Sequence, residues 1–197
     1  MAAMTATETW DFLMEGTRTA HVATVRADGR PHVKPVWFEL AGEPGDFQVV
    51  FTTAAGTVAG RNLRRDGRVA ISVDDPVPPF AFVLVEGSAA LSDDPAELLA
   101  VATRLGGRYM GADRAAEYGA RNGVPPELIV RVTPARVLAQ AGIALRPAER
   151  ADQRRGSPGG ATTSARARGP EAQQPGNSWR TRYISGHPGV CTAKYGQ

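Results

Sequence analysis

The sequence predicts a mainly β domain of six strands with peripheral helices, followed by a tail that does not join the fold. Apolar and polar residues alternate over short segments from Thr17 onward, which is typical of strands with one buried face. Turn-forming residues such as Asp28-Gly29 separate these segments. Near the C-terminus the alternation stops, and Gly, Pro, Ser and Arg dominate. We therefore expect one folded domain over residues 1–145 and a low-complexity, disordered tail over residues 146–197.

A short helix and a β-hairpin open the predicted domain. The segment Thr7–Glu15 places its apolar residues on one helical face, with Thr7 as the expected N-cap, and this helix should cover one end of the sheet. One alternating segment precedes the Asp28-Gly29 turn and a second, His32–Leu40, follows it, which predicts a hairpin. Pro35 lacks a backbone N–H, so the second strand should lie at an edge or carry a bulge.

Four further strands and three helices complete the predicted domain. The strand Phe47–Thr53 contains a continuous apolar run, so we expect it to be buried on both faces. A short helix over residues 56–66 follows, and Asp94-Pro95 has the composition of a helix start. The remaining expected elements are strands at Arg68–Val73, Phe80–Leu91 and Leu128–Val137 and helices at 95–110 and 114–121.

Length and composition argue against several classes of protein. The chain has 197 residues, of which 42% are hydrophobic, and it contains no apolar run near the roughly 20 residues that span a bilayer. Its first residues lack the features of a secretory signal, so we expect a cytoplasmic protein with no membrane partner. The single cysteine, Cys191, rules out an intrachain disulfide, and no ligand cluster predicts a metal site.

The net charge of +3 conceals an asymmetry between the two parts of the chain. Residues 146–197 contain nine Lys and Arg against three Asp and Glu, whereas residues 1–145 contain 14 against 17. The tail is therefore basic and the domain is slightly acidic. A nucleic-acid partner is not expected, because the positive charge does not belong to the folded part.

Four segments in one domain length carry a resemblance to a known family. In chain order they are Gly16–Val25, Asp28–Val33, Pro35–Phe38 and Gly60–Val69. With their hairpin turn, V-W-F strand end and G-R-N-L helix, they resemble the pyridoxamine 5'-phosphate oxidase-like proteins, a six-stranded split β-barrel of the FMN-binding type. Within that family they are most similar to the deazaflavin (coenzyme F420)-dependent reductases. The resemblance covers residues 5 to about 138.

The resemblance implies a homodimer with its cofactor sites in grooves at the subunit interface. The tricyclic ring would rest on strand backbone, and a loop and a helix start would hold the phosphate. It implies no catalytic side chain, because in such enzymes the cofactor carries the hydride chemistry. The residues implied in cofactor binding are His32, Val36, Trp37, Thr52, Thr53, Thr57, Val58, Ala59, Arg61 and Asn62.

The residue types at these positions are chemically suited to that role. Residues 56–60 place free backbone N–H groups and a hydroxyl at a helix N-terminus, where an anion is stabilised. Arg61 could add a charge-assisted hydrogen bond. Thr52 and Thr53 can hydrogen-bond the ring or the ribityl chain, and Trp37 can form a wall beside it. Without the resemblance, the sequence favours a solvated helix residue at Arg61 and a core residue at Trp37 over cofactor ligands.

One position departs from the family pattern. Many members of the F420 branch have a lysine where this chain has Ala59, and that lysine points at the cofactor phosphate. Losing such a contact weakens binding by on the order of ten- to a hundredfold. Lys34, the only lysine in residues 1–145, could compensate if its strand face turns toward the groove.

The resemblance thus implies an F420-dependent oxidoreductase that transfers a hydride between the deazaflavin and a small conjugated organic substrate. Two alternatives stay open: an FMN-dependent oxidoreductase of the same fold, and a non-catalytic flavin- or tetrapyrrole-binding protein. The substrate pocket should be shaped by the loop Asp74–Pro79 and by the helices after Pro95.

Overall fold

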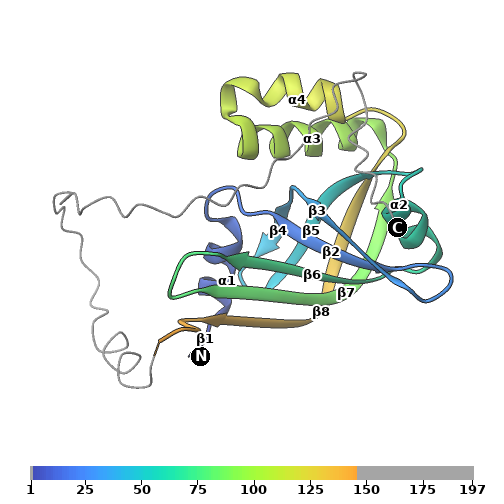
Figure 1. The fold of residues 1–197 in the computed structure, drawn as a ribbon. Coiled ribbons are helices and arrows are strands. Elements are labelled where there is room, and N and C mark those ends of the chain that lie inside the picture. Colours follow the sequence, from blue (N-terminus) through green and yellow to red (C-terminus); the bar gives the residue numbers. More distant parts are fainter. Residues whose placement is uncertain (1, 146–197) are drawn as a thin grey trace, which may run out of the picture. The chain divides into compact units, whose positions relative to one another are not determined.

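A computed structural model of the chain describes residues 2–145, and the tail predicted for residues 146–197 lies outside them. The described residues form one antiparallel sheet flanked by helices, which confirms the mainly β fold class (Figure 1). The sheet order is β3-β2-β6-β7-β8-β5-β4, with β1 paired to β8. The strands are β1 Ala2–Ala3, β2 Ala20–Val25, β3 Pro31–Val36, β4 Glu39–Glu43, β5 Asp46–Ala54, β6 Arg68–Asp75, β7 Ala81–Ser92 and β8 Glu127–Ala141.

The strand expected over His32–Leu40 is divided into β3 and β4 at Trp37 and Phe38. Side chains of a helix, not a neighbouring strand, satisfy the backbone at this break. The Phe38 N–H donates to Tyr109 Oη at 3.2 Å, and its carbonyl accepts from Arg108 Nη1 at 2.7 Å. The ladder therefore stops here while the Phe38 backbone keeps its hydrogen bonds. This division and the short β1 account for the two strands beyond the six expected in the described part of the chain.

The sheet curls until its two ends approach each other. β3 lies at one end of the hydrogen-bonded order, as Pro35 predicts, and β5 lies next to the other end. Nevertheless Lys34 Nζ of β3 lies 3.1 Å from Thr53 Oγ1 of β5. The barrel is thus closed by side chains across this gap, and we call the gap the split.

The barrel core is built from the inward faces of the strands. Val22, Ile71 and Val85 lie opposite one another on β2, β6 and β7 and are buried. Helix α1, Ala6–Met14, closes one end with the buried side chains of Phe12 and Leu13. The prediction that Thr7 caps this helix is wrong. Thr5 is the N-cap, because it forms a reciprocal capping box with Glu8.

Helices α2 and α3 flank the split. Helix α2, Val58–Arg65, follows β5 directly, and Thr57 is its N-cap. Helix α3, Pro95–Met110, is capped by Asp94 and packs antiparallel to α4, Ala115–Asn122, after a single 3₁₀ turn at Ala112–Arg114 (Figure 1). We call α3 and α4 together the helical hairpin. No helix of the described part is long and apolar enough to cross a membrane.

Glycines bring the two helices of the hairpin into close contact. A Cβ added to Gly119 would lie 2.0 Å from Thr103 Oγ1 and 3.1 Å from Thr103 Cα. At Gly123 an added Cβ would lie 2.7 Å from Leu99 Cα. Such distances to backbone atoms are below van der Waals contact, so the hairpin requires glycine at both positions.

Gly119→Ala is therefore expected to destabilise the protein by about 1–3 kcal/mol, because overpacking outweighs the gain of roughly 1 kcal/mol that Ala brings to a helix. Chemical denaturation of the full chain measures this difference. Gly56→Ala is the control, because an added Cβ there meets nothing within 4 Å. Equal stability of the Gly119→Ala variant and the native chain would contradict the packing described for the hairpin.

Candidate functional site

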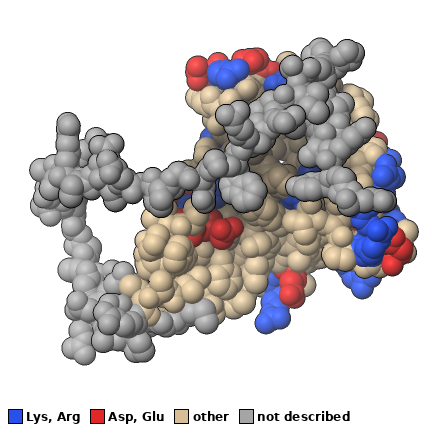
Figure 2. All heavy atoms as spheres, viewed as in Figure 1, with Lys and Arg blue, Asp and Glu red and all other residues tan. Residues whose placement is uncertain are grey.

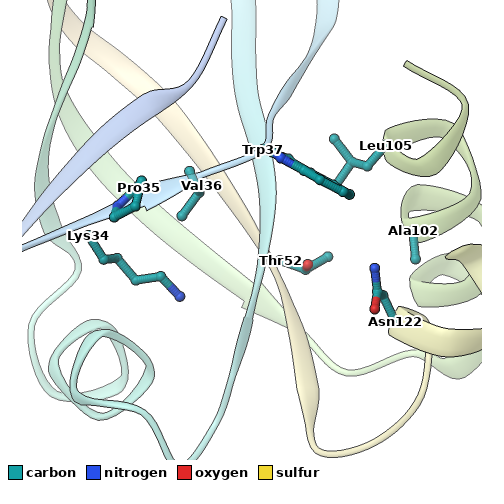
Figure 3. Close-up of a pocket in the computed structure, with 8 residues that line it drawn as sticks. All are labelled: Lys34, Pro35, Val36, Trp37, Thr52, Ala102, Leu105 and Asn122. Carbon is teal, nitrogen blue, oxygen red and sulfur yellow. The ribbon is translucent and has the colours of Figure 1, made fainter. Parts of the chain in front are cut away.

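A cavity of about 160 Å³ opens at the split, between the barrel and the helical hairpin (Figure 3). One wall comes from β3, the break after it and β5, and the other comes from α3 and α4. The cavity is smaller than the roughly 300 Å³ at which pockets begin to enclose a drug-sized ligand, so one chain alone encloses only part of a large cofactor. The lining residues are Lys34, Pro35, Val36, Trp37, Thr52, Ala102, Leu105 and Asn122.

Trp37 is the aromatic residue that lines this cavity. Trp37 stacks on Tyr109 with ring centroids 4.9 Å apart and an interplanar angle of 7°. Tyr109 is fixed in turn, because its Oη donates to the Arg18 carbonyl at 2.6 Å and accepts from the Phe38 N–H. Burial raises the pKa of Tyr109 above its ordinary value, so the phenol stays protonated. The indole of Trp37 is thereby held in place beside the cavity.

Lys34 is the one cation that lines this cavity. It stands on the inward face of β3, opposite buried Val22, and its ammonium lies 3.1 Å from Thr53 Oγ1. Burial lowers the pKa of Lys34, and the attraction of Glu127 only partly offsets that effect. Burial likewise raises the pKa of Glu127. No carboxylate within residues 2–145 forms an ion pair with Lys34 at 4.0 Å or less.

The hydroxyl beside Lys34 connects it to the start of α2. Thr53 Oγ1 lies 3.2 Å from Thr57 Oγ1, which accepts from the Gly60 N–H at 3.1 Å. Gly60 is required here, because an added Cβ would lie 2.4 Å from the Ala54 carbonyl oxygen. Arg61 folds back over the first turn and donates to the Gly56 carbonyl. A cation and the positive end of a short helix therefore lie on either side of one pair of hydroxyls.

The predicted site residues fall into three groups. Val36, Trp37 and Thr52 line the cavity, whereas Thr53 and Thr57 lie behind Lys34 on the way to α2. All the others except His32 lie on α2 itself. Within this last group Val58 is half-buried, Arg61 is exposed, and Ala59 and Asn62 are buried.

Ala59 and Asn62 have structural surroundings. Ala59 is 0% exposed, so a longer side chain at this position would have to displace the core. Asn62 Nδ2 donates to Thr24 Oγ1 at 2.9 Å, a buried hydrogen bond that joins α2 to β2. Neither side chain reaches the cavity in one chain.

His32 does not line the cavity either. Its Nδ1 lies 3.5 Å from Arg26 Nη2, on the hairpin of β2 and β3. Burial, together with the nearby charges of Arg26 and Lys34, lowers the pKa of His32, so its ring is neutral at pH 7. Its predicted contact with a cofactor would require a ligand that extends beyond the cavity.

The sequence predicts only in part the side of the cavity that the helical hairpin forms, which we call the hairpin wall. The helices after Pro95 contribute Ala102, Leu105 and Asn122, whereas the loop Asp74–Pro79 contributes no lining residue. Nothing in the sequence around Asn122 distinguishes it from an ordinary residue at a helix end. Only the folding of α4 back onto α3 brings its amide to the cavity.

These features define a split β-barrel protein of the pyridoxamine-phosphate-oxidase-like class. The family model described as pyridoxamine 5'-phosphate oxidase matches residues 6–141, and the chain belongs to this family. The predicted resemblance is thereby confirmed. No curated protein has detectable similarity to the chain.

Solved structures with the same fold include proteins of different kinds. A conserved hypothetical protein from Mycobacterium tuberculosis is 25% identical, with a TM-score of 0.61 over 73% of this chain and 89% of that one. A protein described as an F420 reductase is 31% identical, with a TM-score of 0.50 over 66% of this chain and 96% of that one. The haem storage protein HutZ from Vibrio cholerae is 20% identical, with a TM-score of 0.56 over 72% and 100%. The last similarity concerns the fold alone.

Proposed function

We propose that this protein is a cytoplasmic oxidoreductase that uses coenzyme F420 and acts on a small conjugated organic substrate. The observation that carries the proposal is the unpaired ammonium of Lys34 at the split, 3.1 Å from Thr53 Oγ1 and directed toward the start of α2. The similarity to an F420 reductase supports deazaflavin over FMN.

The position of Lys34 is unfavourable in the protein alone. A half-buried cation loses hydration, and the positive end of α2 offers it no compensation. An acidic group of a ligand placed between Lys34 and α2 would be stabilised by both. We infer that the phosphate end of the cofactor binds here, held by the Lys34 ammonium, the Thr53 hydroxyl and the N–H groups at the start of α2, while Thr57 caps the helix and donates to the Ala54 carbonyl.

This arrangement accounts for Ala59. Because Ala59 is buried against the barrel, the cation that other family members place on the helix is supplied here from β3 by Lys34. The absence of a lysine on the helix would by itself weaken cofactor binding. Lys34 offsets that loss, because it supplies a positive charge from the opposite wall.

The remaining residues suit the ring of the cofactor. When bound, the reduced deazaflavin supplies a hydride, and water supplies the proton that completes reduction of a conjugated double bond. The protein needs to orient the two partners and exclude water between them. The fixed indole of Trp37, the buried side chain of Val36 and the hydroxyl of Thr52 provide a flat, mostly apolar wall for that purpose.

The affinity of the protein for F420 is expected to fall as pH rises through the pKa of Lys34. Burial lowers this pKa below the ordinary lysine value of 10.5, so the loss begins at a lower pH than for an exposed lysine. In Lys34→Arg the guanidinium stays charged, and the affinity should vary little between pH 8 and 11. Fluorescence titrations across this range test the difference. Equal pH profiles for the two proteins would show that Lys34 does not contact the anion.

The outer face of the sheet supports a homodimer. Leu84 and Leu138 lie opposite each other on β7 and β8 and remain 38% and 37% exposed. The same cross-strand row continues through Ser72 and His21 to Pro35, which lines the cavity. Figure 2 shows mostly uncharged atoms on the visible part of the described surface, with a few charged side chains among them. We propose that a second copy covers the row and completes the cavity.

Leu84→Asp is expected to convert the dimer into monomers, because it places a charge in the centre of that apolar row. Light scattering of the full chain measures the mass, and F420 titration should show at least tenfold weaker binding. Val77→Asp changes an exposed apolar residue outside the cross-strand row and serves as the control. A monomeric native protein, or a Leu84→Asp variant that stays dimeric, would refute this interface.

A further inference from the structure

The hairpin wall of the cavity has no role in the cofactor binding proposed above. The barrel wall supplies the cation and the flat surface, whereas Ala102, Leu105 and Asn122 face them from α3 and α4 (Figure 3). A cavity with two chemically different walls can hold the reactive end of a cofactor against one and a second molecule against the other.

Asn122 is the polar residue on this wall, and its amide is uncommitted. Ala102 and Leu105 are buried apolar residues, and neither carries a charge or a hydrogen-bonding side chain. No group within residues 2–145 hydrogen-bonds to the Asn122 side chain. In Figure 3 this amide and the side chain of Thr52 face the cavity from opposite sides. The wall thus presents an apolar surface with one site for a directed hydrogen bond.

The position of Asn122 is fixed by its neighbour. Gly123 follows it at the end of α4, and its backbone approaches α3 so closely that an added Cβ would lie 2.7 Å from Leu99 Cα. Gly119, one turn earlier, packs against Thr103 in the same way. The amide is therefore presented from a rigid helix end, which favours selective recognition over a general surface contact.

We infer that Asn122 is the specificity-determining residue of the substrate site and donates a hydrogen bond to a carbonyl oxygen of an uncharged substrate. The substrate is uncharged because the hairpin wall offers no ion partner and the only lining cation, Lys34, is taken by the cofactor. This inference rests on the proposed function, because it assigns the cofactor to the opposite wall.

The test compares ligand binding and cofactor binding in the same variants of the full chain. The probe is cyclohexanone, an unreactive ketone, titrated by NMR into the protein saturated with oxidised F420. In Asn122→Leu and in the nearly isosteric Asn122→Asp, neither of which can donate, we expect about tenfold weaker ketone binding. The affinity for F420 should change less than twofold. Val77→Ala, at an exposed position outside the cavity lining, should leave both affinities unchanged.

Each outcome decides one claim. If ketone binding is unchanged in both variants while F420 still binds, Asn122 does not select the substrate. If Asn122→Asp binds the ketone as well as the native chain, the hydrogen bond is not donated by this residue. If F420 fails to bind the native chain, the proposed function fails, and this inference fails with it. A thermal midpoint for each variant shows that a lost affinity does not reflect unfolding.

Discussion

Lys34→Met is expected to weaken F420 binding by about ten- to a hundredfold, the largest effect that a single substitution at the site should have. Methionine keeps most of the length and apolar contact of the side chain but removes the charge. The unloaded protein should unfold at the same temperature or a higher one, because burial of the ammonium opposes folding. Fluorescence titration and thermal unfolding of the same samples measure both quantities.

Two control variants separate this role from a general effect of charge. Lys34→Arg keeps a cation at the split and should bind F420 within about tenfold of the native chain. Arg30→Met removes one positive charge from the exposed β2–β3 turn, where Arg30 pairs with Asp28, and should leave the affinity unchanged. An inward-facing lysine also protects an edge strand from pairing with another chain. If Lys34→Met leaves F420 affinity intact, that protective role is the better account of the residue.

Arg108→Ala is expected to lower the free energy of unfolding by about 3 kcal/mol. The half-buried guanidinium donates to the carbonyls of Leu13 at 2.6 Å, Phe38 at 2.7 Å and Gly16 at 3.2 Å. It thus joins the end of α1, the break between β3 and β4, and α3. Its removal takes one donor from each of these carbonyls and also removes a cation–π contact with the Phe38 ring at 4.7 Å.

Arg104→Ala provides the matched comparison, because Arg104 lies one turn earlier on the same helix. Its guanidinium is 54% exposed and pairs with Glu39, whose side chain is 13% exposed, so its removal should cost less than that of Arg108, about 1–2 kcal/mol. Urea denaturation of the two variants gives the difference directly. Similar stabilities for both would show that the Arg108 contacts contribute no more than a surface ion pair.

Much of the fold could be predicted because its signals are local. Alternation and turn residues located the strands, and Pro35 correctly placed β3 at the sheet edge. The break at Trp37 and Phe38 could not be foreseen in this way. It depends on Tyr109 and Arg108, which lie about 70 positions further along the chain and take up the backbone hydrogen bonds.

The sequence predicts most of the site residues on the barrel wall, which β3, the break after it and β5 form. It predicts hardly any on the hairpin wall of α3 and α4. The family resemblance implies Trp37, through its V-W-F motif, and Thr52, through its place at the end of a strand, and both line the cavity. Strand alternation alone does not predict whether the Lys34 side chain faces the cavity. Its contact with Thr53 depends on the curvature of the sheet, which brings β3 close to β5. Asn122 lies at the cavity because α4 packs on α3, and no local sequence pattern predicts that packing.

The central claim is that the split binds a deazaflavin cofactor, and a titration of the full chain with oxidised F420 and, separately, FMN tests it most directly. Trp37 lines the cavity, so quenching of its fluorescence reports occupancy. We predict a dissociation constant in the micromolar range or below for F420 and at least tenfold weaker binding of FMN. Saturable binding of FMN or haem in the absence of F420 binding would contradict the claim.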